Sequence, residues 1–211
     1  MFHKYNLRLL PITSVHFQGP RLGGTYTDGY GDAGANLTAV LRALGGNSDS
    51  FPCIGSPCVH YTSFAMDCED DSGPVTVSVD YLHGWLERMK AGITDSAGTP
   101  LYGWSGVYNG HGICANWNNI VSCFNSYGIR PDFIWIAGYP DGSTIPSSPL
   151  PWNTDGDCDT DNSPCYVALG QSTVLWQYAG DALIAGEYVD LDQGNPNLDF
   201  HTALGQYCPY P

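Results

Sequence analysis

The stretch HYTSFAMDCEDD, residues 60–71, decides the fold class and offers the first candidate site. Its opening residues are mostly β-branched, aromatic or apolar, which predicts a strand arriving from a buried core. Side chains alternate faces along a strand, so Asp67 and Glu69 point the same way and lie roughly 6.5–7 Å apart. Parallel α/β barrels build their active sites at the carboxyl ends of strands. A solvated acidic turn is the alternative interpretation.

The composition predicts one globular domain covering residues 1–211, or two small domains at most. Hydrophobic residues make up 43% of the chain, enough for a core, while 26 glycines and 15 prolines indicate a loop-rich protein. The net charge is −14, with only seven Lys and Arg residues. So few cations argue against nucleic acid and against anionic membrane surfaces as partners. No apolar run approaches the ~20 residues of a membrane span.

Eight cysteines suggest disulfides and an oxidising, extracellular compartment. Local pairing would join Cys53 to Cys58, Cys114 to Cys123 and Cys158 to Cys165, leaving Cys68 and Cys208 for a fourth bridge, although spacing alone proves no connectivity. A zinc site is the alternative, and it lacks any C-x2-C pair. Residues 1–8 do not resemble a secretion signal, so a secreted protein would need a segment upstream of this chain.

Strands and helices are expected to alternate along most of the chain. Apolar residues at helical spacing predict a helix over residues 77–93. Helices over 33–44 and 117–127 are expected as well, closed by Gly45-Gly46 and by Gly128. Strands are expected at 7–17, 60–67, 100–107, 133–139, 173–178 and 187–191. This alternation favours parallel strands with crossover helices, in a barrel or an open α/β sheet, with about six strands rather than eight.

Four segments in order resemble glycoside hydrolase family 25, the Chalaropsis-type lysozymes. The sequence FAMDCED at 64–70 resembles that family's apolar-D-x-E-D strand, and PLY at 100–102 resembles its next strand. FIWIAGY at 133–139 is similar to the L-W-I-A-x-Y strand. LWQY at 175–178, followed by VDLD at 189–192, resembles the terminal W-Q-Y…V-D-L-N pattern.

The resemblance implies a (β/α) barrel of TIM type that is incomplete or reduced, stabilised by disulfides. The family opens with a G-x-D-V-S-x-x-Q strand, and that motif is absent here, with Thr13 where its Asp would stand. Residues 9–17 instead resemble the family's third strand, which implies that the first two strands are missing from this chain. A related family of uncharacterised hydrolase-like barrels shares much of this layout, so the fold alone does not establish activity.

The chemistry that the resemblance implies is acid/base catalysis by carboxylates. Glu69 would be the general acid, its pKa raised by partial burial and by the anionic Asp67 beside it. Asp67 would stabilise an oxocarbenium-like transition state or orient the substrate's N-acetyl group, and Asp190 would be an auxiliary carboxylate. Aromatic side chains could form walls that stack on sugar rings: Tyr102, Trp135, Tyr139, Trp176 and Tyr178. Gln177 alternates away from its aromatic neighbours and is expected to form structural hydrogen bonds.

No cofactor and no metal are expected. Aspartates at 155, 157, 159 and 161 alternate in a loop and could gather a calcium ion, but the Gly and Glu of an EF-hand are absent. A solvated loop is the preferred interpretation.

Two hypotheses of function therefore stand. The first is a secreted lysozyme-type hydrolase that cleaves the β-1,4 bond after N-acetylmuramic acid in peptidoglycan. The second is a non-catalytic extracellular protein on the same scaffold, which binds glycan or self-associates through open sheet edges.

Overall fold

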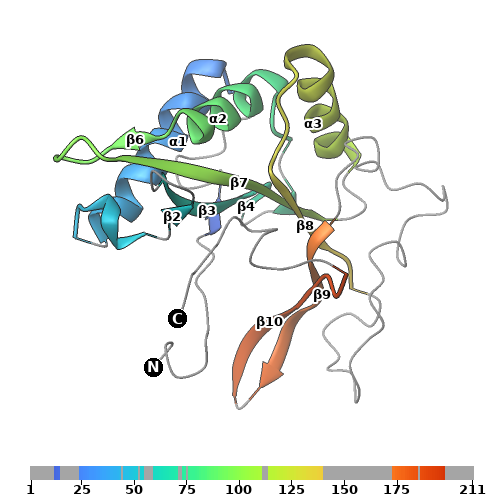
Figure 1. Ribbon diagram of the computed structural model, residues 1–211. Helices are drawn as coiled ribbons and strands as arrows, with labels where there is room; N and C mark the ends of the chain where they lie inside the picture. Colours follow the sequence, from blue (N-terminus) through green and yellow to red (C-terminus); the bar gives the residue numbers. More distant parts are fainter. Residues whose placement is uncertain are drawn as a thin grey trace.

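An eight-stranded sheet covered on one face by three helices forms the described part of the protein (Figure 1). The computed structural model describes residues 12–14, 24–43, 45–51, 53–54, 59–70, 73–74, 76–110, 114–139, 173–184 and 186–197. The helices are α1 (Tyr26–Ala43), α2 (Val79–Ala91) and α3 (Cys114–Tyr127). None of the described helices combines the length and apolar character that a membrane crossing requires.

The main sheet has the strand order β1-β3-β7-β8-β9-β10. These strands are β1 (Ile12–Ser14), β3 (Val59–Asp67), β7 (Pro100–Gly110), β8 (Phe133–Ala137), β9 (Thr173–Ile184) and β10 (Glu187–Gly194). The first five are mutually parallel, and β10 returns antiparallel to β9. Short β2 (Cys53–Ile54) and β6 (Ile93–Thr94) pair with β3 and β7, and β4 (Glu69–Asp70) pairs with β5 (Gly73–Pro74) in a separate ladder.

The predicted TIM barrel, even in incomplete form, is therefore wrong, although the α/β class with parallel strands is right. A barrel of this type requires every main strand to run parallel to its neighbours. The antiparallel return of β10 ends the parallel series, and within the described residues the edge strands β1 and β10 do not pair with each other. The sheet is a mixed half-barrel.

The predicted disulfides are also contradicted. Cys68 and Cys123 both carry reduced thiols, so neither the bridge to Cys208 nor the bridge to Cys114 forms. Burial raises the pKa of the Cys123 thiol to about 11, with a smaller effect from the Asp80 charge. Side chains of the other six cysteines, 53, 58, 114, 158, 165 and 208, lie outside the described residues. Two of the four bridges expected from the sequence are therefore absent.

Helix α2 shows how local sequence fixes an element. The Ser78 hydroxyl accepts the backbone N–H of Tyr81 at 3.1 Å, which caps the first turn, and Gly92 ends the helix at φ 67°. Side chains at 3.6-residue spacing then point into the core, where Trp85 and Met89 are fully buried. Each such side chain stabilises the fold by about 1.5–3 kcal/mol.

The α1–α2 pair packs unusually closely because two glycines meet the opposite backbone. A Cβ at Gly29 would lie 2.0 Å from the carbonyl oxygen of Tyr81, and one at Gly84 would lie 2.1 Å from that of Tyr26. Both helices, with α3, cover the main core cluster, in which Phe64 contributes from the sheet. The three helices therefore occupy one face of the sheet and leave the opposite face to other side chains.

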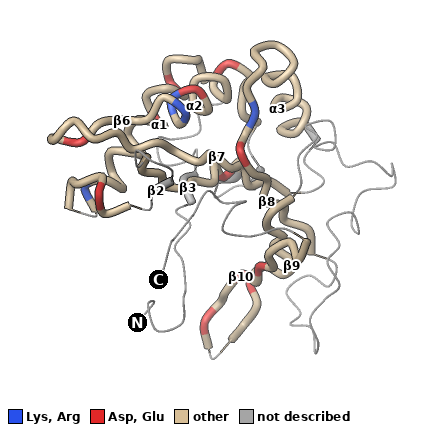
Figure 2. The backbone as a smooth tube through the Cα atoms, in the orientation of Figure 1, with Lys and Arg blue, Asp and Glu red and all other residues tan. Residues whose placement is uncertain are grey.

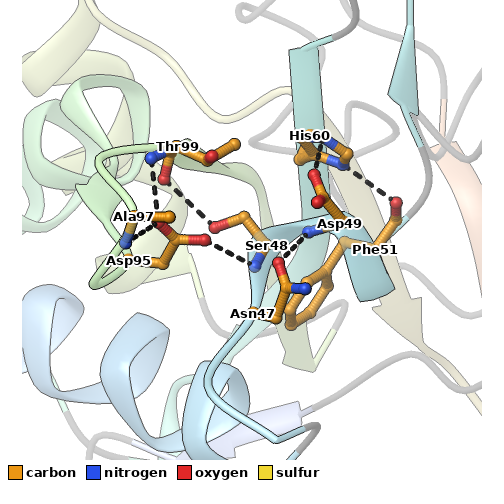
Figure 3. Close-up of polar contacts among 8 residues, drawn as sticks. All are labelled: Asn47, Ser48, Asp49, Phe51, His60, Asp95, Ala97 and Thr99. Atoms are coloured by element: carbon orange, nitrogen blue, oxygen red, sulfur yellow. Dashed lines mark hydrogen bonds and ion pairs between the residues drawn. The ribbon is translucent and has the colours of Figure 1, made fainter.

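Asp95 secures the turn between β6 and β7 (Figure 3). One carboxylate oxygen accepts the backbone N–H groups of Ala97 at 2.9 Å and Thr99 at 2.8 Å. The other accepts the N–H of Ser48 at 3.0 Å, from a 3-10 turn 47 residues earlier. These N–H donors hold the pKa of Asp95 below its ordinary value, because they stabilise the ionised form.

Candidate functional site

Aromatic side chains line the face of the sheet opposite the helices, and we call this surface the aromatic face. Residues in register on adjacent strands point to the same side. Tyr61 on β3 is in register with Tyr102 on β7, and their ring centroids are 5.6 Å apart. The aromatic face comprises Tyr61, Tyr102, Trp104, Tyr108, Phe133 and Trp135.

One row of residues crosses this face near the carboxyl ends of three parallel strands. Asp67, the last residue of β3, is in register with Tyr108, which is in register with Trp135 on β8. The Tyr108 and Trp135 rings meet edge to face with centroids 5.0 Å apart, and both residues are buried. The parallel register therefore places a half-buried carboxylate at one end of an aromatic pair.

Gln177 on β9 organises two tyrosine hydroxyls beside this row. The hydroxyls of Tyr108 and Tyr139 each donate to its side-chain oxygen at 2.5 Å, and the two hydroxyl oxygens lie 3.5 Å apart. Gln177 is only 4% exposed, so its amide position is fixed by packing. The structural hydrogen-bonding role expected for Gln177 is consistent with these contacts.

Asp192 on β10 brings a second carboxyl group to the Trp135 end of this row, four strands along the sheet from Asp67 on β3. It is in register with Gln177, and its Oδ1 accepts the indole N–H of Trp135 at 2.8 Å. Asp192 is an exposed residue, but partial burial of its carboxyl group against Trp135 raises its pKa to about 6, opposed by the Trp135 hydrogen bond and reinforced by the Asp190 charge. A carboxyl group that holds its proton to pH 6 can act as a general acid.

The three carboxylates predicted from the sequence do not all lie at this site. Asp67 lies in the aromatic row, and Glu69 follows it in β4, with a side chain outside the described residues. Asp190 is exposed, and its Oδ1 accepts the backbone N–H of Asp181 at 3.1 Å. Asp181 has a positive φ of 55°, so Asp190 stabilises an unusual backbone conformation in the hairpin.

The predicted aromatic residues divide between the two faces. Tyr102, Trp135 and Tyr139 lie on or beside the aromatic face. Trp176 alternates with Gln177 and donates its indole N–H to the carbonyl of Gly138 at 2.9 Å, so it is used structurally. Tyr178 lies on the same side as Trp176, with ring centroids 5.8 Å apart. Trp176 and Tyr178 are therefore away from the row.

Two residues of the site, Tyr108 and Asp192, were not singled out from the sequence. Tyr108 could have been found by extending the β7 alternation six residues from Tyr102. No sequence pattern indicates Asp192, because the irregularities in β10 on either side of Leu191 change the face of the sheet on which the following side chains lie.

The described part of the chain contains no group of three or more His, Cys, Asp or Glu side chains placed to hold a metal ion. The alternating aspartates at 155–161 lie outside the described residues.

Comparisons with known proteins define the fold only. No protein-family model and no curated protein matches the sequence. A crystal structure of an uncharacterized B. stearothermophilus protein matches 94% of this chain and 75% of its own, with a TM-score of 0.57 and 19% sequence identity. At that identity the likeness shows that the described architecture occurs in a second protein.

Proposed function

We propose that this protein is a glycoside hydrolase whose active site lies on the aromatic face. The observation that carries the proposal is Asp192, a carboxyl group protonatable near pH 6, held against Trp135 in the row that begins at Asp67. Glycoside hydrolysis requires one carboxyl group to donate a proton and another to remain ionised. Peptidoglycan, outside the cell, is the substrate that the family 25 resemblance implies.

In this mechanism Asp192 donates a proton to the glycosidic oxygen as the bond to the sugar breaks. Asp67, with Glu69 two residues after it, supplies negative charge to the oxocarbenium-like sugar that forms. A water molecule then adds to that sugar and gives up a proton, so that Asp192 is protonated again. Gln177 fixes the hydroxyls of Tyr108 and Tyr139, which orient the substrate's polar groups.

Substrate binding is supported by Tyr102 and Trp104, the two half-buried aromatic residues of β7, whereas Tyr108 on the same strand is buried. Aromatic rings present apolar faces suited to the C–H surfaces of sugars, while their polar atoms take hydrogen bonds. The indole N–H of Trp104 is buried with no hydrogen-bond partner among the described residues. An unsatisfied buried donor is unfavourable, so a sugar hydroxyl that accepts this N–H would remove the penalty.

The test is digestion of purified peptidoglycan by the parent and four single variants, with released fragments identified by mass spectrometry. We expect the parent to release muramic-acid reducing ends, with activity falling as the pH rises past about 6 because Asp192 loses its proton. Asp192→Asn should abolish release, and Asp67→Asn and Glu69→Gln should reduce it by about 100-fold or more.

Asp190→Asn is the matched control, because it makes the same chemical change two residues away on a side chain that accepts a hydrogen bond within the hairpin. It should retain most activity. Equal losses in the Asp190 and Asp192 variants would contradict the assignment of the acid, and no release by the folded parent would contradict the enzyme.

A non-catalytic protein that binds glycan or self-associates is the second candidate, favoured by the hairpin tip. Leu183, Ile184 and Tyr188 are 56%, 42% and 73% exposed, which is unusual for large apolar side chains. For this candidate, pull-down on insoluble peptidoglycan without any turnover, or a stable oligomer by light scattering, is the expected result. A monomer that neither binds nor cleaves glycan would contradict both candidates.

A further inference from the structure

A pocket of about 470 Å³ lies on the outer surface of α1, where α2 packs against it. It is on the helix side of the sheet and is separate from the aromatic face. Its floor is formed by small residues of α1: Gly31, Gly34, Ala35, Thr38 and Ala39. Tyr30, Arg42 and Arg88 complete the lining. A slim molecule could therefore lie directly on the helix surface between two cationic side chains.

The two arginines are notable because cations are scarce in this protein. The chain has seven Lys and Arg residues against 21 Asp and Glu. In the described part of the chain, blue segments that mark Lys and Arg are few and lie apart from one another (Figure 2). Yet neither Arg42 nor Arg88 forms an ion pair within the described part of the chain. Glu87, next to Arg88 in sequence, instead contacts His83 at 3.2 Å and the Tyr26 hydroxyl at 3.0 Å. The pocket therefore holds two positive charges that the described carboxylates leave unneutralised.

Arg88 is already positioned for a ligand. Its guanidinium lies 5.0 Å from the centroid of the Tyr30 ring and donates to the Tyr30 hydroxyl at 3.3 Å. A Cβ at Gly34 would come within 3.1 Å of the Arg88 Nε, so glycine leaves room for the guanidinium against α1. At Gly31 nothing lies within 4 Å of where a Cβ would stand, so protein packing does not require glycine there.

The spacing of the two cations indicates the shape of the ligand. Arg88 lies beside Gly34, and Arg42 follows eight residues later on α1, about 12 Å along the helix axis. An elongated ligand with an anionic group at each end suits two cations whose backbone positions are separated in this way. Two guanidinium groups balance two single negative charges, and their planar donor forks match carboxylates.

We propose that this pocket binds a small organic dicarboxylate, with one carboxylate at Arg88, the other at Arg42, and a slim linker over the small residues of α1. The site does not depend on the glycan hydrolase proposed above, because it uses the other side of the sheet.

The test is a titration of the ¹⁵N-labelled full chain with unbranched dicarboxylates from succinate to sebacate, followed by two-dimensional NMR. Acetate is the monoanion control. The amides of Gly31 and Gly34 should shift on titration, with the tightest binding at one intermediate linker length. Arg42→Gln and Arg88→Gln should each weaken that binding by about tenfold, the loss of one charge-assisted contact.

Lys90→Gln is the matched charge control, because Lys90 is an exposed cation on α2 that does not line the pocket. It should bind like the parent. Three results would overturn the proposal: dicarboxylates that bind no better than acetate, an Arg42→Gln variant that binds as tightly as the parent, or an equal loss in Lys90→Gln. Arg42 is exposed, so its substitution tests the site even if Arg88→Gln does not fold.

Discussion

Replacing Asp192 with asparagine should stabilise the protein at neutral pH while removing its proposed catalytic acid. The pKa of Asp192 is raised from 3.8 to about 6 in the folded protein. One pKa unit equals about 1.4 kcal/mol, so ionising this group in the fold costs about 3 kcal/mol. The residue retains exposed surface, and solvent screening reduces that figure to about 1–2 kcal/mol.

The pH range of the effect follows from the direction of the shift. The folded protein holds the proton more tightly than the unfolded chain, so Asp192 imposes no penalty below pH 3.8. As the pH rises from 3.8 to about 6, the parent loses stability through this residue, and above that the penalty is complete. Asparagine carries no charge at any pH, and its amide oxygen can still accept the Trp135 indole N–H.

Urea unfolding followed by tryptophan fluorescence at pH 3.5, 5 and 7.5 measures this difference. The variant and the parent should have nearly equal free energies of unfolding at pH 3.5. At pH 7.5 the variant should be more stable by about 1–2 kcal/mol. Glu187→Gln, which removes an exposed charge from the same strand, is the control for net charge and should show no such trend.

A stability difference that stays constant between pH 3.5 and 7.5 would refute the reasoning, because it would mean that Asp192 titrates normally. A variant that is less stable than the parent at pH 7.5 would refute it as well, since the ionised carboxylate would then be stabilising.

Three further outcomes are expected. Asp95→Asn should lower the free energy of unfolding at pH 7 in urea titrations, and the deficit should shrink as the pH falls below 3.8, because the depressed pKa of Asp95 stabilises only the ionised form. Gly84→Ala should destabilise the protein by at least about 1–3 kcal/mol, because the added methyl group would clash with the Tyr26 carbonyl. Gly31→Ala, where the added methyl group meets open space, should stabilise the protein by up to about 1 kcal/mol, and thermal unfolding of both variants measures the difference. Cys123 should resist iodoacetamide at pH 8 and react once unfolded, as read by mass spectrometry, because burial raises its pKa to about 11.

Elements with strong local signals were predictable from the sequence. The expected helix over 77–93 contains α2, Val79–Ala91, because the apolar residues follow a period of 3.6. The Ser78 cap and the closing Gly92 lie inside the expected range and give the helix its tighter bounds. The expected strands at 60–67 and 133–139 correspond to β3 and β8, since buried parallel strands form continuous apolar runs.

Sheet closure was not predictable, because strand direction depends on partners rather than on composition. The strand expected at 173–178 continues as β9 to Ile184 and turns at Gly186, whose φ is 92°. That tight turn makes β10 antiparallel to β9. The alternating pattern of a strand does not indicate whether its neighbour runs parallel or antiparallel to it. The four segments that resemble barrel enzymes therefore indicate individual strands and do not establish whether the sheet closes.

The site residues that lie on regular strands were predictable, because side chains alternate between the two faces of such a strand. Asp67 and Trp135 lie on regular stretches of β3 and β8, so alternation assigns their face. The strand expected at 100–107 ended one residue before Tyr108, because element ends are the least defined part of a pattern. Asp192 depends on two adjacent irregularities in β10, which no period describes.

The β9–β10 hairpin gives the site a cooperative character. This hairpin extends away from the helices (Figure 1), and it alone supplies both Gln177 and Asp192. Local opening of the hairpin would withdraw the acceptor of the tyrosine pair and the acid in one event. By mass action, any ligand that requires both groups would hold the hairpin closed. Binding at the aromatic face should consequently slow amide hydrogen exchange along both strands together, as a single unit.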